Sequence, residues 1–255
     1  MKEFEELLKI ITVLLDPKNG CPWDLKQTPE TLRPHMIEEV YEISEAIELN
    51  DAELLKEELG DLLLHIVFQC KIAEQDEQFS IKDVIAKINE KMKRRHPHIF
   101  GDISVKTAEE VEHNWEKIKR KEKAHRNSIL EGLPKSLPAL IKARRIQSKA
   151  ATVGFDWENV TDTFAKLKEE LLEFEHELQK NDAKKMKEEI GDLIFALVNV
   201  ARKLDIDPEF ALELTTKKFM RRFGYIEKTL KENLFSSNLT EMENLWQKAK
   251  DEEDG

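Results

Sequence analysis

Acidic residues spaced three apart occur in pairs in this chain of 255 residues. One series comprises Glu39, Glu42, Glu58 and Asp61, and 131 residues later the same series returns as Glu170, Glu173, Glu189 and Asp192. Helical residues three apart share a face, with Cβ atoms about 5–6 Å apart. Four carboxylates crowded at the edge of an apolar core cost roughly several kcal/mol per ion unless they are paired. A hard divalent cation removes that cost, and Mg²⁺ prefers oxygen ligands and keeps waters for a phosphate-bearing substrate. We therefore expect a Mg²⁺ site in each series, which Mn²⁺ can also occupy.

The two acidic series belong to a longer internal repeat. Residues 38–69 align without a gap with residues 169–200, and 13 of the 32 positions are identical. Most of the identical residues are acids, whereas a duplicated helical hairpin needs only its apolar residues to form a core. The conserved acids of the repeat therefore indicate a function beyond folding.

Basic and aromatic residues also recur after each acidic series. Lys91, Arg94 and Arg95 precede Trp115, and Lys218, Arg221 and Arg222 precede Trp246. These cations can bind a polyphosphate opposite the Mg²⁺ site, and each tryptophan can stack on a base. Alternatively, the cations only complement the dipole at the end of their helix, and the tryptophans are only buried in the core.

The elements that position these residues are predicted to be helices. Apolar residues at helical spacing predict helices over residues 4–15, 36–49, 52–75, 81–95, 137–152 and 240–251, with a further helix from Thr107 and the second copy opening near residue 161. Residues 21–35 are predicted to be a loop, because three prolines interrupt them. The apolar runs around Asp61 and Asp192 are expected to be buried, Ile190 included. Burial is also expected for Val40 and Ile47, and for the stripe of Val84, Ile85, Ile88 and Met92. We predict an all-α fold of two tandem helical-bundle domains, 1–122 and 137–255, joined by a linker at 123–136.

Composition excludes several classes of protein. The formal net charge of -11 argues against binding to a nucleic-acid backbone. Two cysteines imply no disulfide framework, and no apolar run approaches the roughly 20 residues of a membrane span. The acidic amphipathic N-terminus is unlike a signal peptide. We expect a cytoplasmic protein that binds neither nucleic acid nor membrane.

Two other functions were weighed. A ferritin-like di-iron site needs a histidine three residues after a glutamate in two helices, and aspartate occupies that position here. His65 has no counterpart in the second copy, where Ala196 stands, and a core histidine is the preferred interpretation. A helical module that binds a protein or a nucleotide without turnover is the remaining alternative.

The pattern Glu-Glu-x-x-Glu followed by Glu-x-x-Asp resembles the all-α nucleoside triphosphate pyrophosphohydrolases of the MazG type. The segments CPWDLKQT, EELGDLLLHIVF, KMKRRHPHIFGD, SLPALIKARRIQSKAATVGFDW and EEIGDL extend the resemblance over nearly the whole chain. It implies a helical bundle that forms homodimers, and Mg²⁺-dependent hydrolysis of a nucleoside triphosphate to the monophosphate and pyrophosphate.

The resemblance also implies roles for individual residues. The metal ligands are Glu170, Glu173, Glu189 and Asp192, with Glu39, Glu42, Glu58 and Asp61 in the first copy, and the C-terminal domain is the main catalytic one. Nucleotide contacts are implied for Lys166, Lys168, Glu169, Lys185, Lys187, Glu188, Lys218, Arg221, Arg222 and Trp246, and for Arg94, Arg95 and Trp115. Lys218, Arg221 and Arg222 would offset charge on the departing pyrophosphate. Leu54 stands where the second copy has Lys185, so first-copy substrate binding is the less expected of the two.

Overall fold

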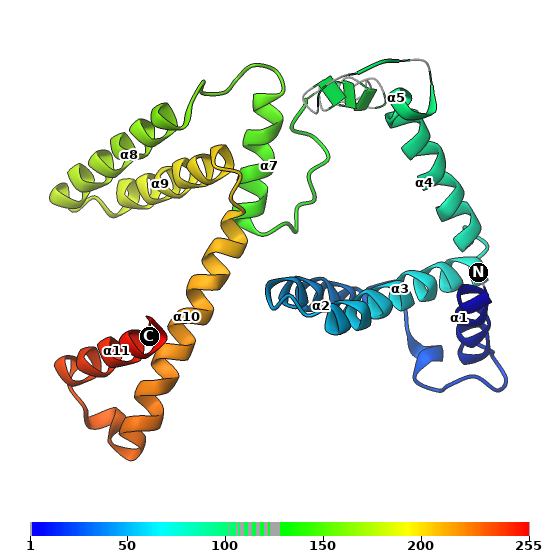
Figure 1. Cartoon of the computed structure of the whole chain (residues 1–255), viewed down its shortest axis with the longest axis horizontal. Helices are drawn as coiled ribbons and strands as arrows, with labels where there is room; N and C mark the ends of the chain where they lie inside the picture. The colour runs from blue at the N-terminus through cyan, green and yellow to red at the C-terminus, as the bar shows by residue number, and fades with distance from the viewer. Residues whose placement is uncertain are drawn as a thin grey trace. The chain divides into compact units, whose positions relative to one another are not determined.

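The protein is described by a computed structural model that covers residues 2–101, short stretches between 103 and 122, and residues 128–254 (Figure 1). The described residues form helices and no strand, as the composition predicts. The chain divides into two compact units, residues 1–115 and 116–255. The predicted boundaries at 122 and 137 stay a prediction, and most of the helix predicted from Thr107 lies outside the described residues.

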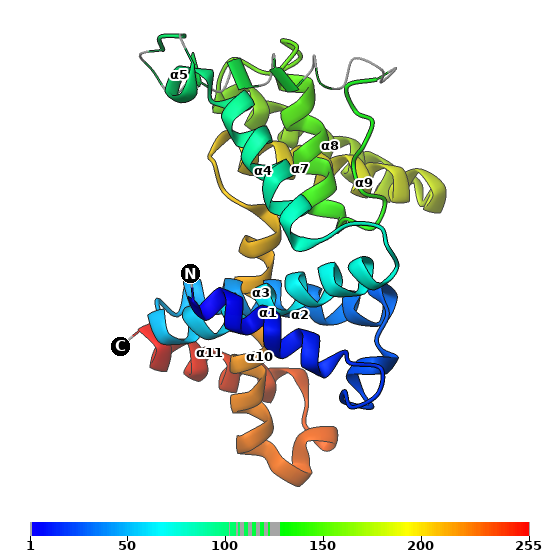
Figure 2. The same cartoon turned by 90° about the vertical axis from the view of Figure 1, so that its right-hand side faces the viewer.

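The first unit is built on a helical hairpin. Its helices are α1 (Lys2–Leu14), α2 (Pro29–Glu48), α3 (Ala52–Gln75), α4 (Ile81–Arg95) and α5 (Pro97–Phe100), with a 3₁₀ turn, η1 (Asp24–Lys26). Helix α1 packs on α3 (Figure 2). Ile11, Leu15, Leu32, Val67 and Phe68 form the apolar core of this unit.

The start of α2 corrects the predicted loop over residues 21–35. The helix begins at Pro29, because Thr28 and Thr31 form a capping box and proline suits the first helical turn. Pro34 lies inside α2 and does not end it. The loop is therefore shorter than the three prolines indicated.

The second unit repeats the hairpin. Its helices are α7 (Ala139–Ala151), α8 (Val160–Lys180), α9 (Ala183–Lys203), α10 (Pro208–Leu230) and α11 (Leu239–Asp254), with the 3₁₀ segment η2 (Lys231–Ser236). Helices α8 and α9 lie side by side, and α7 packs on α9 (Figure 1). Helix α11 packs on α10 around Ile226, Leu230 and Leu245.

Both hairpins turn in the same way. Asn50 and Asn181 have φ of 52° and 56°, in the left-handed region that asparagine tolerates better than most residues. The next residue caps the second helix: the Asp51 carboxylate accepts from the Glu53 and Leu54 amides, and the Asp182 carboxylate accepts from the corresponding amides of α9. This shared turn places the two acid-bearing helices of each copy antiparallel and in contact.

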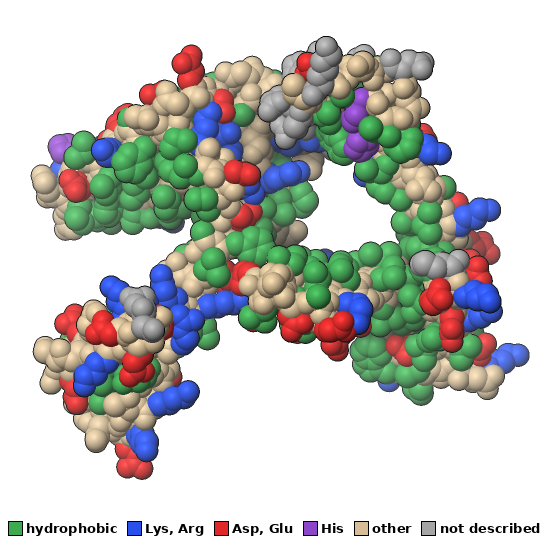
Figure 3. Space-filling view, in the orientation of Figure 1, with side chains coloured by type: hydrophobic (Ala, Val, Ile, Leu, Met, Phe, Trp, Pro, Cys, Tyr) green, Lys and Arg blue, Asp and Glu red, His purple; other side chains and the backbone are tan. Residues whose placement is uncertain are grey.

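Many apolar side chains predicted to be buried are exposed in the single chain. On α9, Ile190, Ile194 and Leu197 are between 44 and 55% exposed. Leu172 of α8, for which burial was not predicted, is 64% exposed. Figure 3 shows apolar side chains gathered over this hairpin. The same holds for Val40 and Ile47 of α2 and for the apolar stripe of α4, formed by Val84, Ile85, Ile88 and Met92. The prediction was wrong because two helices can cover only one face of each other.

No helix in the described part of the chain is long and apolar enough to cross a membrane.

Candidate active site

The hairpin of the second unit brings three of its four predicted acids together. Carboxylate oxygens of Glu170, Glu173 and Glu189 all lie within 4.8 Å of one another. Glu170 is only 7% exposed, whereas Glu173 faces solvent. Burial and then the carboxylates of Glu173 and Asp192 raise the pKa of Glu189. Asp192 is thus close enough to act on the cluster, although it lies outside the group of three.

The first unit gathers a different three of its four acids. Oxygens of Glu39, Glu58 and Asp61 lie within 4.8 Å of one another. Burial, then Glu42 and Asp61, raise the pKa of Glu39, and burial, then Glu42 and Glu39, raise the pKa of Glu58. Glu42, the fourth acid, therefore also contributes to the field at this cluster.

Both clusters fit a hard divalent cation. Their donor atoms are carboxylate oxygens, the ligands that Mg²⁺ and Mn²⁺ prefer. Burial and then repulsion by neighbouring carboxylates raise the pKa values of Glu58 and Glu189, and a bound cation would offset both effects. The crowding of acids predicted from the repeat is thus present in each unit.

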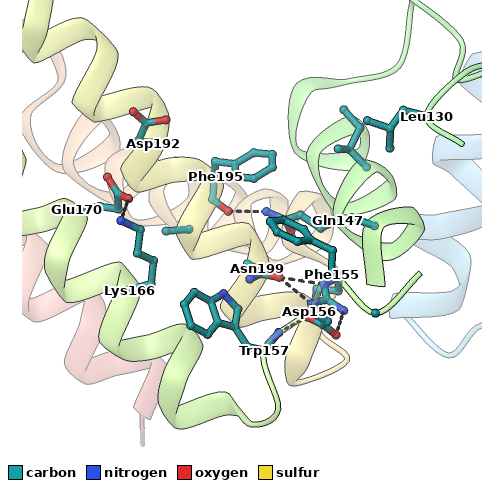
Figure 4. A pocket seen from close by; sticks show the side chains of 15 residues that line it. Leu130, Gln147, Phe155, Asp156, Trp157, Lys166, Glu170, Asp192, Phe195 and Asn199 are labelled. Carbon is teal, nitrogen blue, oxygen red and sulfur yellow. Dashed lines mark hydrogen bonds and ion pairs between the residues drawn. The ribbon is translucent and has the colours of Figure 1, made fainter. Parts of the chain in front are cut away.

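A lysine holds the buried glutamate of the second cluster. The Lys166 ammonium group lies 2.7 Å from carboxylate oxygens of both Glu169 and Glu170, and these hydrogen bonds raise the pKa of Lys166 (Figure 4). Glu169 and Lys166 were both predicted to contact the nucleotide, and in this structure they form an ion pair with each other. Lys168 lies over the Phe164 ring at 4.9 Å. Lys185, Lys187 and Glu188 are exposed in the first turns of α9.

In the first unit, histidines occupy this place. The His65 Nε2 atom lies 3.4 Å from a Glu39 oxygen, and the His65 ring stacks on the His35 ring at 6.0 Å between centroids. Burial and His35 lower the pKa of His65. The predicted core histidine is thus part of the surroundings of the acidic cluster, a placement that a lone histidine in an apolar run does not signal.

The predicted basic group of α10 contacts α11. The Arg221 and Arg222 guanidinium groups donate to opposite oxygens of Glu253 at 2.6 and 2.9 Å, and together they lower the pKa of Glu253 to about 2. Arg222 also lies 5.6 Å from the centre of the Trp246 ring. Trp246 itself is half-buried against Phe219, and Lys218 on the same helix is exposed.

The first unit repeats this arrangement. Arg95 lies 5.7 Å from the centre of the Trp115 ring, and Arg94 forms an ion pair with Glu90. Trp115 also contacts the His96 ring edge-on. Each copy thus stacks an arginine on its tryptophan.

A cavity of about 650 Å³ adjoins the second cluster and was not predicted. Glu170, Lys166 and Asp192 lie at one end, and Gln147, Phe155 and Leu130 at the other (Figure 4). The remaining lining includes Trp157, Phe195, Ala196 and Asn199. The pair of aromatic residues in the GFDW segment ahead of α8 was the signal that could have revealed it.

Glu177 is a further acid that the repeat did not reveal, since Ala46 stands at its place in the first copy. It is buried, one oxygen accepts from Lys180 at 2.8 Å, and Oε2 has no hydrogen-bond partner among the described residues. Together with Glu173 and Glu189 it lines a smaller cavity of about 370 Å³.

Comparison with known proteins gives a consistent result. The family model of the MazG nucleotide pyrophosphohydrolase domain matches residues 27–100 and 158–225, so each acidic series lies in one matched segment. The nucleoside triphosphate pyrophosphohydrolase of Escherichia coli K12 is 41% identical over 99% of this chain and 99% of its own. The nucleoside triphosphate pyrophosphohydrolase/pyrophosphatase MazG of Thermotoga maritima is 43% identical over 97% of this chain and 95% of its own. A crystal structure of a MazG-related protein from Thermotoga maritima covers 46% of this chain and 98% of that chain, with 34% identity and a TM-score of 0.40.

Proposed function

Because the chain belongs to the MazG nucleotide pyrophosphohydrolase family, we propose that its carboxylate clusters bind Mg²⁺ and that the second cluster is the main catalytic centre. The chain is a nucleoside triphosphate pyrophosphohydrolase, which cleaves its substrate to a nucleoside monophosphate and pyrophosphate. The observation that supports the proposed centre is the convergence of Glu170, Glu173 and Glu189 on one point between α8 and α9.

In this proposal Glu170, Glu173 and Glu189 bind the metal together with Asp192, and Mn²⁺ can replace Mg²⁺. A divalent cation at such a site supplies charge stabilisation at phosphate oxygens and lowers the pKa of water. Lys166 orients Glu170 through their 2.7 Å contact and adds positive charge beside the substrate phosphates. One carboxylate of the cluster acts as general base. Glu39, Glu42, Glu58 and Asp61 bind a second metal ion in the first unit.

The remaining predicted residues contact the nucleotide. Lys218, Arg221 and Arg222 offset the charge on the departing pyrophosphate, and Trp246 contributes a planar surface. In the single chain Glu253 neutralises two of these cations, so polyphosphate binding has to displace that carboxylate. Further substrate contacts are proposed for Lys168, Glu169, Lys185, Lys187 and Glu188, and in the first unit for Arg94, Arg95 and Trp115.

The enzyme is proposed to work as a homodimer. The exposed apolar faces of α8 and α9 are broad enough to require a cover, and burying them against a second copy removes them from water. The substrates are free nucleotides rather than nucleic acid, in keeping with the net charge of -11, and the cytoplasm is the proposed site of action.

Product analysis tests the proposed centre. We expect pyrophosphate, and no orthophosphate as first product, from nucleoside triphosphates in the presence of Mg²⁺. A chelator should abolish its release, and Mn²⁺ should restore it. Glu189→Gln, which removes one charge from the second cluster and keeps its size, should reduce kcat by roughly 10³-fold. Full activity in this variant, or after complete removal of metal, would refute the metal centre.

A further inference from the structure

The cavity beside the second cluster has two ends of different chemistry. Its carboxylate end contains Glu170 and Asp192 with Lys166, and the rest is mainly apolar (Figure 4). At about 650 Å³ it lies in the range of roughly 300–1,000 Å³ that is usual for small-molecule sites. A ligand whose charged end reaches the carboxylate cluster can therefore place an uncharged end of considerable size in this cavity.

Two side-chain amides face this uncharged end. The Gln147 Nε2 atom donates to the Phe195 carbonyl at 2.8 Å, which fixes the amide and leaves Oε1 as an acceptor. Gln147 is 8% exposed, and its Oε1 has no hydrogen-bond partner among the described residues. A buried acceptor without a partner is unfavourable, so a ligand that displaces the atoms enclosing Oε1 and donates a hydrogen bond to it gains affinity.

The second amide belongs to Asn199, and here the oxygen atom rather than the amino group is already hydrogen-bonded. The Asn199 Oδ1 atom accepts from Arg202 Nε and Nη2 at 3.0 and 2.8 Å, so this residue can offer its amino group to a ligand. The Arg202 guanidinium is anchored in turn by Asp156. The lining therefore holds two amides of fixed orientation, an acceptor on Gln147 and a donor on Asn199, and the Gln147 Oε1 atom is enclosed until a ligand displaces its neighbours.

Aromatic side chains complete the lining. Phe155, Trp157 and Phe195 all border the cavity, and Phe155 is 82% exposed. An exposed aromatic ring that borders an apolar cavity gains by stacking on a planar ligand. Fixed amides beside aromatic rings suit a nucleobase.

We propose that this cavity binds the nucleoside of the substrate and that Gln147 is a specificity-determining residue, its Oε1 accepting a hydrogen bond from an N–H group of the base. This inference rests on the proposed catalytic centre, since the carboxylate cluster sets where the triphosphate lies. The substrate class is a nucleoside triphosphate whose base carries an N–H donor on its hydrogen-bonding edge.

The first test varies the base donor. Wild-type enzyme is assayed with uridine, inosine and adenosine triphosphates, with the analogues that lack the donor (N3-methyluridine, N1-methylinosine and purine riboside triphosphates), and with ribose 5-triphosphate, which has no base. For the nucleotide with the highest kcat/KM, we expect this kcat/KM to be at least tenfold higher than that of the analogue of the same nucleotide without the donor. In Gln147→Leu, the ratio of kcat/KM for that nucleotide to kcat/KM for ribose 5-triphosphate should fall by roughly tenfold to a hundredfold.

A second variant guards against misfolding of Gln147→Leu. Phe155→Ala removes an exposed ring and leaves the core intact, and it should lower the same ratio by about fivefold to a hundredfold. Phe235→Ala is the matched control, because Phe235 is 98% exposed and does not line the cavity. It should change neither the ratio nor the circular dichroism spectrum.

The outcomes separate the two proposals. If pyrophosphate is released but neither variant changes the ratio, or the wild type does not distinguish the analogues, the nucleobase cavity is refuted and the catalytic centre stands. If no triphosphate yields pyrophosphate, the catalytic centre is refuted. The cavity is then judged by titrating the wild type and Trp157→Phe with the nucleoside alone: quenching of fluorescence that Trp157→Phe abolishes supports it, and no quenching refutes it.

Discussion

The two copies of the hairpin share a backbone and differ in what surrounds their acids. At the position where the second copy has Lys166, the first has His35, and where the first has His65, the second has Ala196. The first glutamate of the series therefore has different neighbours: Glu170 contacts the Lys166 ammonium group, and Glu39 contacts the imidazole of His65, whose pKa is lowered. Duplication preserved the carboxylates, while the cations beside them diverged.

The helix that packs on each hairpin differs too. In the first unit α1 contributes Ile11, which is fully buried in an apolar core with Leu15 and Phe68. In the second, α7 contributes Gln147 to a cavity beside the carboxylates. A shared acidic series therefore does not make the two copies equivalent, because the space and charge for a substrate depend on residues outside that series.

The largest difference between the copies should follow removal of their equivalent aspartates. Asp192→Ala is expected to lower kcat/KM by about 10³-fold, because it removes a proposed ligand of the main centre. Asp61→Ala should leave most of the activity, with a loss below roughly threefold. Pyrophosphate release measures both. Equal losses would contradict the ranking of the two copies.

An exchange of the neighbouring cations sharpens the comparison. Lys166→His should reduce kcat/KM by roughly tenfold at pH 8, because a neutral imidazole replaces a charged hydrogen-bond donor to Glu170. The reciprocal change, His35→Lys, should leave kcat/KM for the whole enzyme within about twofold. An equal effect of both changes on turnover would show that the first copy contributes to catalysis.

Asp156 anchors the segment ahead of α8 and has a consequence for pH. Burial alone would raise its pKa, but hydrogen bonds from Arg202 and Lys203 lower it below the ordinary 3.8. This carboxylate therefore stabilises the fold fully above about pH 4, and the contribution is lost as pH falls through the lowered pKa.

Asp156→Asn should cost about 1–2 kcal/mol in free energy of unfolding at pH 7. The difference from wild type should shrink below pH 4. Urea denaturation at pH 7, 5 and 3.5 measures it, and a cost that does not depend on pH would contradict the assigned ion pairs. Asp24→Asn, in η1 ahead of α2, is the control, and it should change the free energy of unfolding little at any of these pH values.

The smallest effect should be the same in both copies. Asn50→Ala and Asn181→Ala each place alanine, which cannot form the local hydrogen bonds of asparagine, in left-handed backbone. Each substitution should lower the free energy of unfolding by about 1 kcal/mol. Because the two turns have nearly the same φ, the two losses in free energy of unfolding should agree within about 0.5 kcal/mol. A large difference would show that the hairpins rely on their turns to different degrees.

The helices were predictable where capping chemistry is written in the sequence. Asp51 and Ser80 mark the starts of α3 (Ala52–Gln75) and α4 (Ile81–Arg95), and both helices begin and end where predicted. The start of α2 was missed, because a threonine capping box can start a helix among prolines. Burial of Ile194 and Leu197 was overestimated, since the apolar pattern does not say which molecule covers a face.

The acids of the site were predictable because they are repeated, and repetition separates them from the many other glutamates. Gln147, Phe155 and His65 could not be predicted in the same way. Each occurs in one copy only: Gln147 on α7 and Phe155 in the segment between α7 and α8 line the cavity that reaches the acids, and His65 of α3 contacts Glu39 across the packed hairpin. Spacing gives neighbours on one helix, but tertiary packing decides neighbours between helices.

The position of α7 has a consequence for how this enzyme can change. Helix α7 reaches the cavity through Gln147, Ile146 and Ala150, and it contributes none of the clustered carboxylates. If the cavity binds the base as proposed, substitutions along this one helix should alter which nucleotide is accepted while the hydrolytic chemistry is kept. Evolution or protein engineering could then diversify the substrate range by changing the α7 side chains that line the cavity, without changing the carboxylates.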